Sequence, residues 1–273
     1  LRRQLQMCIR DSMKRTYVKL LTVAGLTGCF LFTSCRSAQE TTARYEISKV
    51  EGNMITIDST WDANPDKKAT TVLKPYKDKV DAMMYEVIGT SEMKMDKGTP
   101  ESLLSNLVAS VLQEAAAQVL GKPADMGLVN MGGLRNILPK GDITVGAVFE
   151  ILPFENSLCV LTMKGTDMKR LFKAIASLHG EGVSGIRLEI NKKGELLNAT
   201  IGGKPVVDDQ LYTVATIDYL ADGNGRMDAF LQAEKRECPE DATLRGLFLD
   251  YVRKQTAEGK IITSKLDGRI TVK

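Results

Sequence analysis

The apolar residues between Glu101 and Leu120 recur at steps of three and four, and this pattern constrains the fold more than any other feature. Such spacing is typical of an amphipathic helix with one buried face. Pro100 suits the first turn of that helix, and Gly121-Lys122-Pro123 suits its end. The sequence therefore predicts a long helix that must cover an apolar surface supplied by the rest of the chain.

Runs typical of strands alternate with further helical patterns. We expect strands over residues 44–49, 54–58, 84–88, 126–129, 157–163, 211–217 and 268–272, and a hairpin from residues 185–191 and 195–201. We expect further helices over residues 69–84, 144–151, 167–178 and 242–257. No repeat or interior linker interrupts them. The sequence predicts one α+β domain over residues 45–273, with a mixed β-sheet and packed helices.

The N-terminal residues have the pattern of an export signal. A basic stretch begins at Met13, and an apolar run over residues 20–32 follows that is too short to cross a membrane. We interpret residues 13–35 as a signal peptide. Residues 1–12 do not fit this pattern, and we interpret them as an upstream extension that is not native.

Cys35 follows small residues at the end of the apolar run, as the acylated cysteine of a bacterial lipoprotein does. Cys29 matches the strict lipobox better, but cleavage there would leave Phe30-Leu31-Phe32 in the mature protein. We therefore favour lipidation of Cys35, followed by a polar tether over residues 36–44. A plain secretory signal is the alternative. The lipoprotein interpretation predicts anchoring in the cell envelope, on the periplasmic side of the outer membrane.

The charge of the expected mature chain argues against a general nucleic-acid binder. Residues 1–34 carry six Lys or Arg and one Asp, whereas the whole chain has a formal net charge of +3, so the remainder is about −2. A nucleic-acid binder would need a basic face. Two further residues, Cys159 in an apolar run and Cys238 in a charged loop, belong to the domain. We interpret Cys159 as a buried small hydrophobe, and a disulfide between the two is the alternative in an exported protein.

The segment Asn130-Met131-Gly132-Gly133-Leu134-Arg135 follows the strand expected at residues 126–129. A loop at the carboxyl end of a strand is a common place for a ligand. The paired glycines permit positive φ and let a ligand approach backbone N–H groups closely. Arg135 offers a planar, permanently charged group suited to phosphate or carboxylate. By itself, the hexapeptide is equally compatible with a tight turn that carries a surface arginine.

Further motifs follow in a fixed order: GDITVG at residues 141–146, ILPFEN at 151–156, LTMKG at 161–165 and YTVATIDYLADG at 212–223. This succession resembles the C-terminal domain of 5′-nucleotidases and UDP-sugar hydrolases over roughly residues 70–272. The resemblance implies a substrate-binding domain in which two aromatic rings, here Phe154 and Tyr219, stack on the nucleobase. The polar groups implied around the ligand are Asn130 and Arg135 on the sugar or phosphate side, and Asn156 and Asp218 at polar edges. Without the resemblance, both rings would be interpreted as core residues.

The sequence departs from the family pattern at two places. An arginine usually stands three residues before the glutamate of the first helix, but here Gly98 precedes Glu101 and Lys97 lies beside it, so a phosphate contact is lost. The GGDG segment that follows the second aromatic is replaced by Gly223-Asn224-Gly225-Arg226, without the acidic residue that contacts ribose. Asp222 or Asp228 would have to substitute for it.

In the family resembled, hydrolysis belongs to a separate metallophosphatase domain with DxH, GDxxD, GNHE-like and GHxH segments. This sequence has a single histidine, His179, and neither a DxH nor a GNH segment. No CxxC motif or Cys/His cluster suggests zinc. We therefore expect no catalytic residue, bound cofactor or metal in this chain, and interpret His179 as a helix-capping or surface residue.

Two functions of different class remain. The first is a nucleotide- or nucleoside-binding module that works with a separately encoded metallophosphatase carrying the divalent metals, with an interface on the side of the Gly132-Gly133 loop. The second is a non-catalytic surface lipoprotein that binds another small ligand or a protein partner. An enzyme acting alone would need a site that the motifs do not reveal.

Overall fold

The computed structural model describes residues 47–273. The expected signal peptide, Cys29, Cys35 and the tether over residues 36–44 lie outside the described residues. The chain divides into an N-terminal unit that ends at Asp58 and a compact unit, Ser59–Lys273. In the first unit, the described residues 47–58 are exposed and form no helix or strand, so the strand expected at residues 54–58 is wrong. The apolar residues Met54, Ile55 and Ile57 in this segment are exposed.

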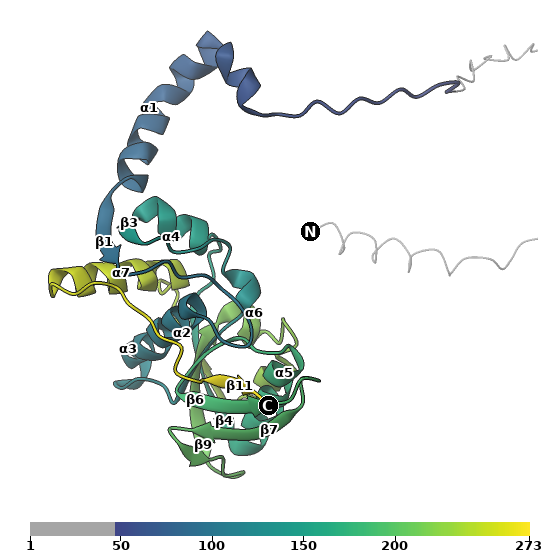
Figure 1. Ribbon diagram of the computed structural model, residues 1–273, viewed down its shortest axis with the longest axis vertical. Coiled ribbons are helices and arrows are strands. Elements are labelled where there is room, and N and C mark those ends of the chain that lie inside the picture. Colours follow the sequence, from purple (N-terminus) through teal and green to yellow (C-terminus); the bar gives the residue numbers. More distant parts are fainter. Residues whose placement is uncertain (1–46) are drawn as a thin grey trace, which may run out of the picture. The chain divides into compact units, whose positions relative to one another are not determined.

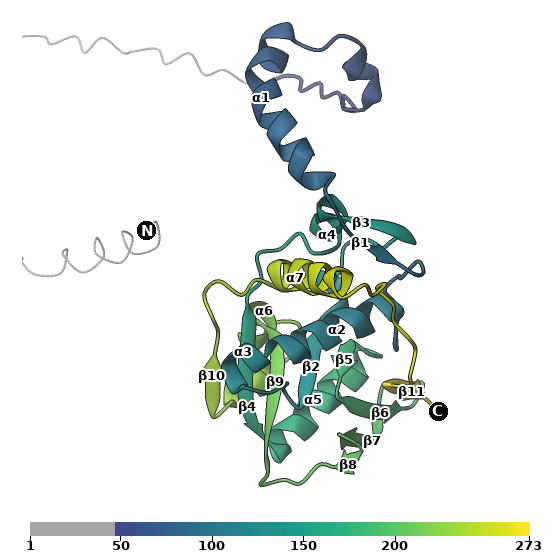
Figure 2. The same ribbon diagram turned by 90° about the vertical axis from the view of Figure 1, so that its left-hand side faces the viewer.

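A five-stranded sheet forms the centre of the compact unit, in the order β10-β4-β9-β2-β5. Figure 2 shows these strands in this order from left to right. β2 is parallel to β9, and the other neighbouring pairs are antiparallel. All four residues of β2 are buried, which fits a strand covered on both faces. The strands are Lys235–Glu237 (β10), Leu158–Lys164 (β4), Leu211–Ile217 (β9), Met126–Val129 (β2) and Gly182–Ser184 (β5).

Two smaller sheets accompany the central one. The first contains the expected hairpin, β6 (Ile186–Ile190) with β7 (Leu196–Ile201), extended by β8 (Lys204–Pro205) and by the parallel strand β11 (Ile270–Val272). The second pairs β1 (Val87–Ser91) with β3 (Gly141–Thr144). Sequence patterns missed β3, β5, β8 and β10, which have two to four residues each and show no clear alternation, whereas the equally short β2 and β11 were predicted. The prediction of an α+β domain with mixed sheets is confirmed.

The helix predicted between Glu101 and Leu120 is present but interrupted. It begins later than predicted, as α2 (Leu103–Ala115), because the Ser102 hydroxyl accepts the N–H of Ser105 and caps it. Ala116 separates α2 from α3 (Ala117–Leu120), which ends at Gly121 with a positive φ of 70°. The stretch is apolar and long enough to cross a membrane by composition. However, α2 packs against β2 and β5 and is a core helix.

The remaining helices pack on the sheets or on other helices (Figure 1). α7 (Leu244–Ala257) packs on α2 and β1, and α5 (Gly165–Ser177) packs on β4 and β9. α4 (Val145–Ile151) begins at the cap residue Thr144 and contacts both α7 and α1. α1 (Lys67–Met84) has no buried residue, and the short 3-10 helix η1 (Ser59–Ala63) precedes it.

A disulfide joins Cys159 on β4 to Cys238 directly after β10. Cys159 is fully buried, as expected, but the interpretation as a free hydrophobic residue is wrong. The reason lies in the register: β10 pairs Glu237 with Val160 of β4, so the two cysteines occupy the next position of the same ladder. Without knowledge of β10, the 79-residue separation concealed this proximity.

Candidate functional site

Three segments of the central sheet meet at one edge. β2 and β9 are parallel and in register, with Gly127 opposite Ala215, so their carboxyl ends lie side by side. β4 is antiparallel to β9 and begins with Leu158 opposite Ile217. The loop after β2, the turn after β9 and the segment before β4 therefore converge. Each of these segments carries residues that the sequence singled out.

At this edge, the structure forms a pocket of about 310 Å³. Six of the eight expected ligand-binding residues line it: Asn130, Gly132, Gly133, Phe154, Asn156 and Tyr219. The ring-bearing residues are 48% exposed at Phe154 and 44% at Tyr219. Both rings are therefore accessible. Without the family resemblance, the sequence would have placed both rings in the core, and the structure does not. Arg135 and Asp218 do not line the pocket but lie in its flanking segments.

The glycine loop (residues 130–135) begins with the short 3-10 helix η2 (Met131–Gly133). Neither Gly132 nor Gly133 has the positive φ that glycine permits. Instead, the Asn130 side chain folds over them, and a Cβ at Gly133 would lie 3.0 Å from Asn130 Oδ1. A side chain at Gly133 would therefore require the Asn130 side chain to shift slightly, whereas Gly132 has room for an ordinary contact. Asn130 Oδ1 is buried without a hydrogen-bond partner in the described chain, an unusual state for a polar atom.

Two cations lie against the carbonyl oxygens of the glycine loop. Lys97 Nζ donates to the carbonyls of Leu134 and of Met131, the latter at 3.4 Å. Arg135 Nη1 donates to the carbonyl of Gly132 at 3.3 Å. Both side chains are exposed. Lys97 therefore lies at the loop although the family arginine position beside it is Gly98, and sequence reasoning did not assign it to the site.

Glu181 contacts the backbone of the glycine loop. Sequence reasoning did not assign this residue to the site either. Its Oε2 accepts the backbone N–H of Met131 at 2.5 Å. Burial raises the pKa of this carboxyl to about 6, although the bond from Met131 lowers it. The residue directly precedes the three-residue strand β5, whose burial has no sequence signature. The loop thus contacts one mostly buried carboxyl and two exposed cations.

Arg245 on α7 holds the segment that carries Phe154. Its Nη1 donates to the carbonyl of Leu152 at 3.2 Å, and its Nη2 pairs with Glu155. The guanidinium carbon lies 4.1 Å from the centre of the Phe149 ring, within the range of a cation–π contact. Arg245 is only 8% exposed. This buried arginine therefore fixes the residues on both sides of Phe154.

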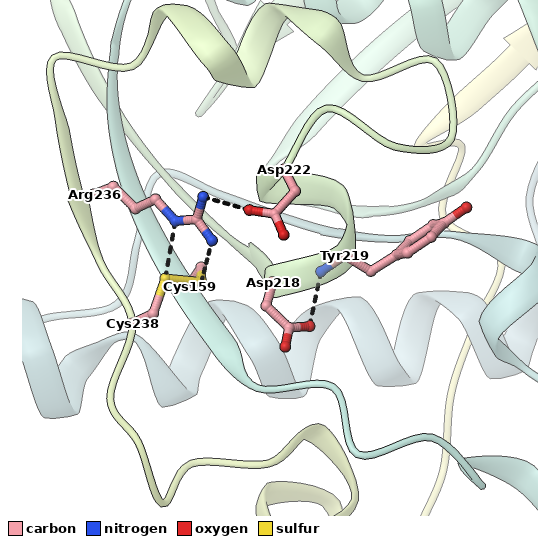
Figure 3. Close-up of a disulfide and its surroundings, with 6 residues drawn as sticks. All are labelled: Cys159, Asp218, Tyr219, Asp222, Arg236 and Cys238. Carbon is pink, nitrogen blue, oxygen red and sulfur yellow. Dashed lines mark hydrogen bonds and ion pairs between the residues drawn. A yellow bond between two sulfur atoms is a disulfide. The ribbon is translucent and has the colours of Figure 1, made fainter. Parts of the chain in front are cut away.

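Tyr219 lies in the single-turn helix α6 (Asp218–Ala221) that follows β9. Asp218 Oδ1 accepts the N–H of Tyr219 at 2.7 Å, and Asn224 Nδ2 donates to the Tyr219 carbonyl at 3.0 Å. The Asp222 carboxylate pairs through Oδ1 with Arg236 at 2.7 Å. Figure 3 shows the Tyr219 ring on the other side of this turn from Arg236. Asp218 thus shapes the turn.

The remaining polar residues named by sequence reasoning have other surroundings. Glu101 accepts bonds from Asn106 and from the backbone N–H groups of Asp267 and Arg269, so it ties α2 to the C-terminal segment. His179 follows α5 with a positive φ of 59°. Across residues 47–273, no group of three or more His, Cys, Asp or Glu side chains is arranged to hold a metal ion.

A larger hollow of about 690 Å³ lies at the opposite end of β9, beside Tyr212. It is open and surrounded by residues of β7, β8 and the Val207–Gln210 segment. Volume alone does not identify a binding site, and this hollow has no exposed aromatic ring among its lining residues. We therefore assign the smaller pocket between Phe154 and Tyr219 as the candidate site.

Comparisons with known proteins bear on the family of this chain. Residues 87–232 match the family model described as 5′-nucleotidase, C-terminal domain. The chain is 28% identical over 188 residues to the endonuclease YhcR of Bacillus subtilis, covering 66% of this chain and 15% of the relative. It is 27% identical over 238 residues to the trifunctional nucleotide phosphoesterase protein YfkN of the same organism. This match covers 80% of this chain and 16% of the relative.

Among solved structures, the 5′-nucleotidase precursor of Thermus thermophilus is similar, with a TM-score of 0.64 and 26% identity. The match covers 77% of this chain and 44% of that one. The chain spans 15–30% of the length of the first three curated relatives. The family match covers more than half of the chain and includes the residues that line the pocket. This chain belongs to the 5′-nucleotidase C-terminal domain family.

Proposed function

We propose that this domain binds a nucleotide or nucleoside, with the base between Phe154 and Tyr219. One observation carries the proposal: two accessible aromatic rings from different segments line a single pocket together with the glycine loop. An exposed ring offers an apolar face at which a planar base can stack, and such stacking contributes about 1–3 kcal/mol per base. The pocket volume lies at the lower end of the range of small-molecule sites.

The polar part of the ligand would lie toward the glycine loop. Asn130 and Asn156 line the same pocket and can bond the polar edges of a base or sugar. Lys97 and Arg135 bring two positive charges to the loop, where a phosphate would be attracted. This arrangement supports the proposal that Lys97 supplies the charge that is missing at Gly98.

We further propose that the domain works in nucleotide catabolism with a separately encoded metallophosphatase, and that it is exported and lipid-anchored. The comparisons include a trifunctional nucleotide phosphoesterase, and the match covers only 16% of that protein. The signal-like pattern before Cys35 supports the anchor. Labelling with radioactive palmitate tests it: wild-type protein should incorporate the label and Cys35→Ala should not. Label retained by Cys35→Ala but lost in Cys29→Ala would assign the anchor to Cys29.

Isothermal titration with adenosine, AMP and UDP-glucose tests the binding proposal. We expect binding by the wild-type protein, and a loss in Phe154→Ala of about 1–3 kcal/mol, or about 5- to 150-fold in Kd. Tyr85→Ala is the matched control, because Tyr85 is an exposed aromatic residue that does not line the pocket. Absence of binding by the wild-type protein, or equal losses in both variants, would contradict the proposal.

The departures at Gly98 and Gly225 favour a second candidate function. With the family arginine and ribose-contacting acid absent, the same pocket could hold a different planar ligand, in a surface protein without a role in hydrolysis. In the same titration, this candidate predicts no response to any of the three nucleotide-type ligands. It also predicts that replacing Phe154 or Tyr219 with alanine weakens the binding of the ligand that does occupy the pocket.

A further inference from the structure

We propose that Arg236 is a positioning residue that ties the Cys159–Cys238 disulfide to the turn carrying Tyr219. Through this connection, the edge of the central sheet would fix one wall of the base pocket. The inference rests on the proposed function only where it concerns ligand affinity. The mechanical connection itself can be tested without a ligand.

The first part of the connection is the disulfide. β10 is an edge strand held to β4 by three register pairs, from Lys235 opposite Thr162 to Glu237 opposite Val160. Such a short edge strand has few backbone hydrogen bonds to hold it. The disulfide joins the two strands at the next position, with the Cα atoms 4.2 Å apart. It therefore fixes the place from which Arg236 extends.

The second part is the guanidinium of Arg236, which has a partner on each side. Its Nε donates to Cys238 Sγ at 3.2 Å, and its Nη2 lies 3.8 Å from Cys159 Sγ. Its Nη1 donates to Asp222 Oδ1 at 2.7 Å. Figure 3 shows the group placed between the disulfide and the α6 turn. A planar group with donors pointing in fixed directions restricts the position of Asp222 relative to the disulfide.

The third part is the turn itself. Asp222 ends α6, and its N–H donates to the carbonyl of Asp218 at 2.9 Å. Four residues are too few for a helix that is stable by itself. An external contact at Asp222 therefore adds to the order of the whole turn, including Tyr219 on its outer side. In the loop that follows α6, Gly223, Gly225 and Arg226 all have positive φ.

Arg236→Gln tests the inference because it removes the charge and two of the three donor groups at the far end of the side chain. Lys164→Gln is the matched control: Lys164 forms an exposed ion pair with Glu234 along the same β4–β10 edge, and this pair does not involve α6. In hydrogen-exchange measurements without ligand, the amides of residues 218–223 should exchange faster in Arg236→Gln than in wild type. They should be unchanged in Lys164→Gln. Equal exchange in all three proteins would overturn the inference, whether or not the protein binds a nucleotide.

A double-mutant cycle with adenosine tests the consequence for the pocket. Because the Arg236–Asp222 ion pair is exposed, we expect Arg236→Gln to lower the affinity for adenosine by only about 2- to 5-fold. The loss should disappear when Tyr219 is already alanine, because Arg236 acts through that ring. An undiminished loss in the Tyr219→Ala background would overturn the positioning role. If wild-type protein does not bind adenosine, the proposed function fails, and the exchange measurement decides the inference alone.

Discussion

Glu181 gives the sharpest prediction about stability, since its carboxyl is mostly buried beneath the glycine loop and has one hydrogen bond, from the N–H of Met131. Burial raises its pKa from 4.5 to about 6. The folded protein thus binds this proton more tightly than the unfolded chain does. The resulting stabilisation is complete below about pH 4.5 and is lost as the pH rises through about 6. A shift of about 1.5 units corresponds to about 2 kcal/mol of unfolding free energy.

Glu181→Gln removes the titration while its amide oxygen can still accept the Met131 N–H. The variant and the wild-type protein should have similar melting temperatures at pH 4, where the wild-type carboxyl is neutral. At pH 7.5 the variant should be more stable by up to about 2 kcal/mol, or about 4–8 °C for a domain of this size. Differential scanning calorimetry at several pH values measures this difference. Glu114→Gln, at an exposed position on α2, controls for the loss of a surface charge.

A difference in melting temperature between Glu181→Gln and wild type that stays constant from pH 4 to 7.5 would contradict this prediction. A variant that becomes less stable than wild type as the pH rises would contradict it as well. Such a result would mean that the hydrogen bond from Met131, or another favourable partner of the carboxylate, outweighs the cost of burying its charge. A matching change in Glu114→Gln would instead assign the effect to surface charge.

Other predictions concern the disulfide, the sheet and the phosphate side of the pocket. Serine at both Cys159 and Cys238 should lower the unfolding free energy by about 3–5 kcal/mol in urea denaturation, and a reductant should affect only the wild type. Gly127→Ala would place a Cβ 2.2 Å from the Ala109 carbonyl, costing about 1–3 kcal/mol in thermal unfolding; unchanged stability would contradict the packing of α2 on β2. Lys97→Gln should weaken AMP binding by about 2- to 5-fold and leave adenosine unaffected, and an equal loss for both would place Lys97 away from the phosphate.

Long elements with clear periodicity could be predicted from sequence, whereas several of the shortest strands could not, although β2 and β11 were predicted. The hairpin of β6 and β7 has five and six residues in its strands and a Lys-Lys-Gly connection, so its alternation was visible. β5 and β10 have three residues each, and their pairing depends on distant strands. The break at Ala116 has no sequence signal, because alanine has the highest helix propensity. The disulfide could not be assigned because it depends on β10.

The candidate site could likewise be predicted only in part from the sequence. The motifs predicted which segments would meet, and the parallel register of β2 and β9 explains why they do. Gly132 and Gly133 permit positive φ but do not adopt it, and the nearby Asn130 side chain instead limits the room at Gly133. Lys97 and Glu181 were missed because they reach the loop from other segments. Such contacts arise from tertiary packing.

A crystal structure of the protein with adenosine tests the central claim most directly. We predict the purine between the rings of Phe154 and Tyr219, with the ribose toward the glycine loop. A purine bound elsewhere, such as in the hollow beside Tyr212, would contradict the account. So would crystals soaked at saturating adenosine in which the pocket between the two rings contains only solvent.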